Sequence, residues 1–271
     1  MDPIKKKLKY FYEDVGEKYP EEEIIYHTLR GMLRRKFVLA YLKKFSGSLL
    51  DVGCNRGMYL DEYQGGKRFG ADLSLNVLKK ADKHAEKNLI VADAEQLTCF
   101  RANSFDNILC SEVIEHCLNP QAVFNGIAHV LRQGGSALIT TPDYKRERPK
   151  WIPLASLPHY GVESPSEEGY FHTAYHPEEL AQMAKKAGLS VIEMGTLERE
   201  VKYAAKIPAL IFITIRALNR ILKSKWLEKQ NMIFFNKLTL WVYYCCHYSG
   251  IEKILLPFFK NGVRSFVFVR K

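Results

Sequence analysis

The chain has 271 residues, of which 47% are hydrophobic, and a net charge of +10. This length suits one large domain, or one domain with a sizeable insertion, and it allows a core that needs no disulfide or metal to hold it together. The six cysteines include no CxxC pair and mostly lie in apolar runs, which excludes a secreted disulfide framework and indicates reduced intracellular thiols. The first residues, MDPIKKKLKYFYED, are basic but contain no apolar run, so we expect no signal peptide and a cytoplasmic location.

The first predicted element is helical. Residues 21–45 form a charged, periodic segment without internal proline, which is typical of a helix. We therefore expect residues 1–46 to form an N-terminal helical cap or lid.

From residue 48 to residue 140, short apolar runs alternate with amphipathic stretches. The runs predict strands over residues 48–52, 68–72, 88–92, 105–110 and 136–140. Strands that alternate with helices in this way indicate a parallel, doubly wound α/β sheet. Helices are expected over residues 75–87, with Ser74 as N-cap, and over residues 120–131, with Asn119 as N-cap and proline at the first position. Gly134 and Gly135 are expected to end the second helix and open the fifth strand.

The rest of the chain predicts a helix that ends at Gly188, a strand over residues 190–195 and a last strand over residues 263–271 that would pair at a sheet edge. About sixty residues separate these two strands, far more than an ordinary connection, so they form an insertion. The expected organisation is a cofactor-binding core over residues 47–200, a basic, aromatic-rich helical insertion over 201–260 and a last core strand over 261–271.

The stretch LLDVGCNRGMYL, residues 49–60, suggests a ligand at the end of the first strand. In open α/β sheets, ligands bind beyond the carboxyl ends of the strands. A loop that cradles pyrophosphate has the form GxGxxG, but here the spacing is G-x-N-x-G and the turn follows Asp51. An acid repels phosphate and attracts an amino or sulfonium group. Asp72, about twenty residues on, stands where a carboxylate can accept both ribose hydroxyls.

Five segments in register then carry a resemblance. LLDVGCNRG, GADLS, VADAEQL, FDNILCSEVIEH and LRQGGSALITTP resemble, in order and spacing, the motifs of class I S-adenosylmethionine-dependent methyltransferases, and look most like the type-11 and ubiquinone-pathway group. The resemblance implies a Rossmann-like fold with a mostly parallel seven-stranded sheet, and S-adenosyl-L-methionine as cofactor. Asn55 replaces the usual middle glycine of the loop, but asparagine tolerates the left-handed backbone that such a turn needs.

The resemblance also implies roles for individual residues. The methionine part of the cofactor would lie against Asp51, Gly53, Cys54, Asn55 and Gly57. The ribose would bind Asp72 beside Leu73. The adenine would lie against Asp93 and Ala94, and the sulfonium side would face Ser111 or Glu112.

The segment SEVIEH suggests two further functions. If it is helical, Glu112, Glu115 and His116 share one face and could hold Mg or Mn, with His172 as a further ligand. The same pattern resembles that of ubiquinone-pathway O-methyltransferases and of small-RNA 2′-O-methyltransferases, whereas many type-11 enzymes have a similar segment with no implied metal. We nominate His116 as the catalytic base; His159, His172 and Tyr175 are the other candidates by position.

The insertion holds ten basic and two acidic residues. In IPALIFITIRALNRILK, basic and polar side chains fall on one helical face and Ile211, Ile215, Leu218 and Leu222 on another. Basic, apolar and aromatic residues together fit a membrane interface with anionic lipid; the other interpretation is a helical subdomain that covers the sheet or a partner.

Three functions remain open at this point. The first is methylation of a small, hydrophobic or lipid-linked acceptor by a cytoplasmic or peripheral membrane enzyme. The second is methylation of RNA, which the charge favours but the large aliphatic residues of the basic segment do not. The third is a non-catalytic module that binds the cofactor.

Overall fold

The computed structural model of the chain describes residues 3–18, 27–81, 87–143, 151–153 and 169–271. Seven strands form one sheet in the order β3-β2-β1-β4-β5-β9-β8. Pairs among β1 to β5 are parallel, and β9 runs antiparallel to both of its neighbours. The strands are β1 (Leu49–Val52), β2 (Arg68–Asp72), β3 (Asn88–Val91), β4 (Phe105–Ser111), β5 (Leu131–Pro142), β8 (Ser190–Leu197) and β9 (Arg264–Arg270). The expected doubly wound, mostly parallel seven-stranded sheet is therefore confirmed.

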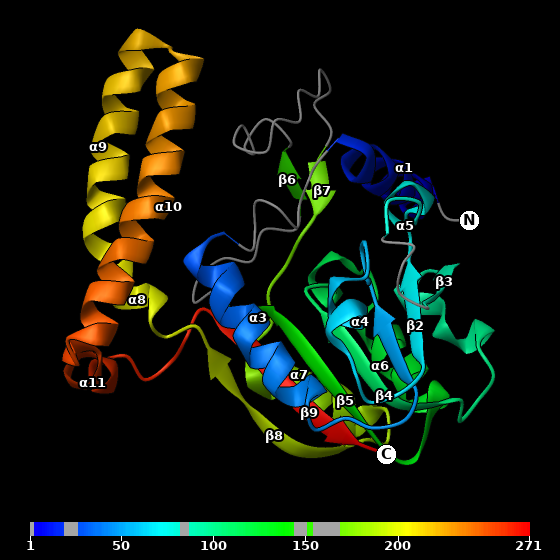
Figure 1. Ribbon diagram of the computed structural model, residues 1–271. Helices are drawn as coiled ribbons and strands as arrows, with labels where there is room; N and C mark the ends of the chain where they lie inside the picture. The colour runs from blue at the N-terminus through cyan, green and yellow to red at the C-terminus, as the bar shows by residue number, and fades with distance from the viewer. Residues whose placement is uncertain (1–2, 19–26, 82–86, 144–150, 154–168) are drawn as a thin grey trace.

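Helices cover both faces of the sheet (Figure 1). On one face lie α6 (Pro120–Val130), α7 (Pro177–Lys186) and the 3-10 helix η1 (Ala94–Cys99), which pack on Leu50, Ile108 and Ile139. On the other lie α3 (Leu29–Leu42) and α4 (Met58–Glu62), which pack on Leu49 and Leu109. Neighbouring residues of one strand thus face opposite layers, so the central strands need apolar residues at every position.

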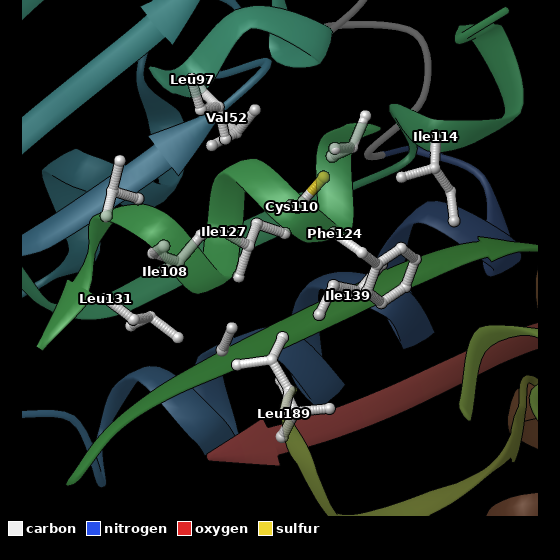
Figure 2. Packing of buried hydrophobic residues seen from close by; sticks show 14 of the residues in the cluster. Val52, Leu97, Ile108, Cys110, Ile114, Phe124, Ile127, Leu131, Ile139 and Leu189 are labelled. Carbon is white, nitrogen blue, oxygen red and sulfur yellow. The ribbon is translucent and has the colours of Figure 1, made fainter. Parts of the chain in front are cut away.

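Figure 2 shows the first of these layers. Phe124 and Ile127 of α6 pack against Ile108 of β4 and Ile139 of β5, and all four side chains are fully buried. Each contributes roughly 1.5–3 kcal/mol by leaving water. This packing holds β4 rigidly, and β4 carries the segment SEVIEH at its end.

Helix boundaries differ from the sequence prediction at two places. Ser74 and Asn119 cap their helices as expected, by accepting from the amides of Val77 and Ala122. However, α5 covers only Leu75–Leu78, and residues 82–86 lie outside the described part. Helix α6 ends at Val130 because Leu131 already pairs with Phe105 of β4, so the two glycines lie within β5 and do not terminate the helix.

The prediction for the last strand was wrong in one respect. We expected it at a sheet edge, but β9 lies between β5 and β8. Phe266, Val267 and Val269 are buried there, which accounts for its dense β-branched and aromatic sequence. The edge strand on that side is β8.

Two parts of the chain lie outside the sheet layers. Helix α1 (Pro3–Lys18) lies beyond the carboxyl ends of the parallel strands, next to α5 and to the ribbon of β6 (Trp151–Pro153) and β7 (Gly169–Phe171) (Figure 1). The second part consists of α8 (Val201–Ala204), α9 (Lys206–Leu222), α10 (Lys225–Tyr248), α11 (Ile251–Leu255) and the 3-10 helix η5 (Leu256–Phe258).

Helices α9 and α10 form an antiparallel hairpin that projects away from the sheet (Figure 1). At its base, Tyr243 of α10 packs with Tyr203 and Ala204 of α8 and with Leu29 and Leu33 of α3. Across the described ranges, none of the helices has the length and apolar character needed to cross a membrane.

Candidate functional site

The loop after β1 adopts the left-handed turn that the sequence predicted. The backbone φ angles of Gly53, Asn55 and Gly57 are 72°, 50° and 86°. A Cβ atom at Gly53 would lie 2.3 Å from Cγ2 of Val113, so this position requires glycine. Asn55 fits the turn because its Oδ1 accepts from the backbone N of Arg56 at 2.8 Å, which offsets part of the cost of a left-handed residue.

Asp72 joins this loop to the end of β2. Its Oδ2 accepts from the backbone N of Asn55 at 2.9 Å, and its Oδ1 accepts from the backbone N of Ser74 at 2.9 Å. Burial, with a smaller effect from the charge of Glu13, raises the pKa of this carboxyl, and backbone donors at Ser74, Asn55 and Leu73 partly oppose the rise. Because a carboxylate offers about four acceptor positions, Asp72 retains capacity for a further hydroxyl donor. Leu73 follows it, half-buried.

Two other predicted residues of this region are buried. Asp51 lies inside β1, within the predicted strand, and is 2% exposed. Burial, and then the charges of Asp51 and Asp72, raise the pKa of the Cys54 thiol. Cys54 is therefore neutral, and it packs in the core cluster between α3 and the sheet rather than acting as a nucleophile.

Helix α1 closes over the ends of β2 and β3 through ionic contacts. Lys5 Nζ lies 2.9 Å from Asp93 Oδ2 and 2.8 Å from Glu95 Oε2. Glu13 accepts from Ser74 Oγ and from the backbone N of Leu75 and Asn76, at 2.9 to 3.0 Å. Lys5 and Glu13 were missed from the sequence, because nothing distinguishes Lys5 from the three other lysines of its cluster.

Asp93 and Ala94 lie at the start of η1, beyond β3. Asp93 caps η1 by accepting from the backbone N of Glu95 at 2.9 Å. Its other oxygen contacts Lys5, so α1 engages the same carboxylate that the sequence assigns to the ligand.

A buried charge cluster surrounds Glu112 at the end of β4. Glu112 has a φ of 61°, and its Oε2 pairs with Arg34 Nη1 at 3.0 Å and with Arg264. Its Oε1 accepts from Thr140 Oγ1 at 3.0 Å, and Thr140 Oγ1 also lies 2.9 Å from Ser111 Oγ. Arg34 of α3 and Arg264 of β9 were also missed, because no local pattern links them to Glu112.

The metal site expected at SEVIEH is not supported by this geometry. The segment forms a single 3-10 turn, η2 (Ile114–His116), and the left-handed Glu112 turns its side chain toward the arginines. Glu115 is buried, and its Oε2 accepts from Thr141 Oγ1 at 3.3 Å. Among the residues that the structure describes, no three His, Cys, Asp or Glu side chains gather as a metal site would require. His172 lies beside His116 without completing such a group.

His116 lies in an aromatic cluster above the end of β4. Its ring centroid is 5.6 Å from that of Tyr12 of α1 and 5.1 Å from that of His172. Its Nδ1 lies 3.1 Å from the carbonyl oxygen of Phe171. Since a carbonyl only accepts, Nδ1 carries the proton and Nε2 is the basic nitrogen. Desolvation, with a smaller effect from His172, lowers the pKa of His116 to about 4, so it is neutral at physiological pH.

The other candidate bases are placed differently. His159 lies outside the described residues. Tyr175 packs against the hydrophobic core, and its backbone N donates to Pro142 at 3.2 Å. Burial lowers the pKa of His172 as well. Among the candidates that the structure describes, His116 and His172 lie next to each other.

Comparisons with known proteins show similarity to methyltransferases. The family model described as a methyltransferase domain matches residues 50–139. A ubiquinone biosynthesis O-methyltransferase of Xanthomonas axonopodis pv. citri is 27% identical over 62% of this chain and 73% of its own length.

Two solved structures share the fold. A putative sarcosine dimethylglycine methyltransferase from Galdieria sulphuraria is 14% identical, with a TM-score of 0.55 over 98% of both chains. Phosphoethanolamine N-methyltransferase 2 of Haemonchus contortus, solved in complex with S-adenosyl-L-methionine, is 23% identical, with a TM-score of 0.50 over 87% of this chain and 52% of that chain.

Proposed function

This chain is a class I S-adenosylmethionine-dependent methyltransferase of the type-11 group, and we propose that it methylates an oxygen of a small hydrophobic or lipid-linked acceptor. The observation that carries this proposal is the neutral His116 with its basic Nε2, next to aromatic residues of the N-terminal helix. A hydroxyl acceptor needs such a base, because its proton must leave as the oxygen is methylated.

The residues beyond the strand ends fit S-adenosylmethionine. Gly53, Asn55 and Gly57 keep the loop backbone open to the methionine part, beside the buried Asp51 and Cys54. The remaining acceptor capacity of Asp72 suits a ribose hydroxyl, with Leu73 alongside.

On the far side of the proposed pocket, Asp93 and Ala94 would meet the adenine, and Ser111 and Glu112 the sulfonium side. The exocyclic amine of adenine and the ammonium group of Lys5 would then both donate to Asp93, whose Oδ2 contacts Lys5. Cofactor binding and the closure of α1 are therefore expected to influence each other.

The mechanism requires little beyond position and a base. When bound, the cofactor supplies an electrophilic methyl group on its sulfonium. His116 Nε2 accepts the hydroxyl proton, and the Phe171 carbonyl stabilises the resulting imidazolium through Nδ1–H. Helix α1 excludes water from the reacting atoms.

The surroundings of His116 support a hydrophobic acceptor. Phe11 and Tyr12 form an edge-to-face pair with ring centroids 5.1 Å apart, and Tyr12 contacts the His116 ring. Such rings favour an apolar or aromatic acceptor over a phosphate-rich one. A lipid-linked acceptor would reside in membranes, and we propose that the enzyme works at a membrane surface.

Transfer of a labelled methyl group from the cofactor to fractionated cell extract tests this function. Label is expected in the organic-solvent extract, in a product whose ether bond resists mild base. The His116→Gln variant should lose most of this label while it still binds the cofactor. Label in RNA or protein, or an undiminished rate for His116→Gln, would contradict the proposal.

A further inference from the structure

The distal part of the α9–α10 hairpin combines apolar and cationic side chains on its solvent surface. We define the hairpin tip as residues 216–229: the end of α9, the turn at Lys223 and Ser224, and the start of α10. The tip stands away from the sheet (Figure 1). Its side chains therefore serve neither the core nor the proposed methyl-transfer site.

Large apolar side chains of the tip face solvent. Leu218, Ile221, Leu222 and Trp226 are between 58% and 81% exposed. In α9, Leu218 lies one turn from Ile221 and Leu222, and Trp226 follows in the first turn of α10. Exposed side chains of this size, close together on a projecting element, mark a surface that leaves water when a partner binds.

Cationic side chains surround these apolar ones. The tip contains five basic residues and one acidic residue, Glu228. All five basic side chains are exposed: Arg216, Arg220, Lys223, Lys225 and Lys229. The partner must therefore offer both apolar volume and negative charge.

We propose that the hairpin tip docks on a bilayer that contains anionic lipid. Apolar side chains then enter the acyl boundary, Trp226 lies at the headgroup level, and the basic residues meet lipid phosphates. An RNA surface would satisfy the cations but leave Leu218, Ile221 and Leu222 in water. A second copy of the chain would bring five like charges toward five others, which repel.

Helix α1 presents the same chemistry on the same side of the molecule. Its Ile4 and Tyr10 are 45% and 66% exposed, and its Lys6 and Lys7 are exposed beside them. In Figure 1, the tip and α1 both lie beyond the carboxyl ends of the parallel strands. Docking through the tip would therefore place the carboxyl ends of the parallel strands on the bilayer side. The surface argument itself does not depend on the proposed acceptor.

Co-sedimentation of the full chain with lipid vesicles tests the docking. Wild type should bind phosphatidylglycerol-containing vesicles, bind pure phosphatidylcholine vesicles far more weakly, and lose affinity as salt increases. The double variant Arg220→Gln/Lys223→Gln should weaken binding about tenfold or more. The double variant Ile221→Ser/Trp226→Ser keeps the charges of Arg220 and Lys223, and it should also weaken vesicle binding about tenfold or more.

Matched controls come from the opposite end of the fold. Lys185→Gln/Lys186→Gln removes two exposed charges from α7, and Ile192→Ser truncates an exposed residue of β8. Both controls should bind vesicles like wild type, and all four variants should retain cofactor affinity by calorimetry. Equal binding by tip variants and controls would overturn the proposal. So would RNA binding with a steep salt dependence and no vesicle binding, or a dimer that the tip variants dissociate.

Discussion

Asn55 shows how one residue preserves a turn that usually requires glycine. Its left-handed backbone and its hydrogen bond to the Arg56 amide place the loop where the amide of Asn55 reaches Asp72. The side chain thus contributes to the local fold, and the loop amide at Asn55 donates to the carboxylate of Asp72.

Substitution of Asn55 separates the backbone requirement from the side chain. Asn55→Gly should keep cofactor affinity within about threefold, because glycine adopts this φ without strain. Asn55→Val should lower the free energy of unfolding by about 1–2 kcal/mol, since a β-branched residue is strained there, and should weaken cofactor binding about tenfold. Calorimetric titration and thermal unfolding measure both. An Asn55→Val variant equal to wild type would show that the turn does not shape the pocket.

His116 predicts an unusual pH dependence. Because desolvation lowers its pKa to about 4, the rate should stay constant from about pH 8 down to about pH 5 and fall only near pH 4. His116→Gln should lower kcat about a hundredfold or more, while His129→Gln, on α6, should not. A rate that falls through pH 6.5 would contradict the proposed environment of His116.

The lowered pKa of His116 also makes the free energy of unfolding depend on pH. In the unfolded chain the histidine titrates near 6.5, whereas in the folded chain it titrates near 4. Between these values the unfolded state binds more protons, so the free energy of unfolding decreases as pH falls through that window. His116→Gln should remove this part of the pH dependence in urea unfolding series.

At the scale of residues, the sequence identified what lies in local patterns. Gly53, Asn55, Gly57 and Asp72 follow directly from one strand, one turn and the next strand. Lys5, Glu13, Arg34 and Arg264 could not be found in this way, because each reaches the site from an element distant in the chain and pairs through geometry alone.

At the scale of elements, strands were easier to predict than helices. Buried parallel strands must be apolar throughout, so their runs stand out, and β2 was predicted to the residue. The helical reading of SEVIEH failed because the left-handed Glu112 separates it from the following turn. Glu112 also pairs with Arg34 and Arg264, and helical periodicity gives no sign of these contacts.

The charge cluster around Glu112 links side chains of α3 and β9 to residues that follow β4 and β8. Arg264 of β9 contacts Glu112 after β4 and Glu198 after β8, the latter through Nε at 2.6 Å, and Arg34 brings in α3. The side chain of Arg264 is 13% exposed. The cluster therefore fixes the end of β4, and with it the approach to His116.

Removal of Arg264 should be costly. Arg264→Met leaves two carboxylates without this partner in a largely dry environment, so the free energy of unfolding should fall by about 3–5 kcal/mol. Arg132→Met serves as the control: its exposed pair with Asp106 should contribute about 0–1 kcal/mol. Denaturant unfolding compares them. If Arg264→Met cost no more than Arg132→Met, the cluster would not be a structural link.

At the scale of the whole molecule, the sheet and its class could be predicted from the sequence, but the position of the last strand could not. Alternating β-branched and aromatic residues predict a strand, yet they do not specify which strands it pairs with. The position of β9 depends on the space between β5 and β8. This space is a property of the assembled sheet.

The position of β9 predicts a sharp effect of truncation. A chain that ends at residue 263 lacks the strand that joins β5 to β8 and also lacks Arg264. It should show no cooperative unfolding transition and bind no cofactor, as measured by calorimetry. A chain shortened only by Lys271 should keep most of its stability. A folded, cofactor-binding chain without β9 would contradict this view of the sheet.

The interior position of β9 also determines when strands can pair during synthesis of the chain. Strands β1 to β5 can pair as they leave the ribosome, but β8 finds β9, its sheet neighbour among the described strands, after the whole α8–η5 segment has been made. At about 5–20 residues per second, that wait lasts roughly 3–12 s for sixty residues. During it, the exposed edge of β5 and the apolar hairpin are both present on the nascent chain. Folding of this protein in the cell should therefore depend on chaperones in this last stage more than in any earlier one.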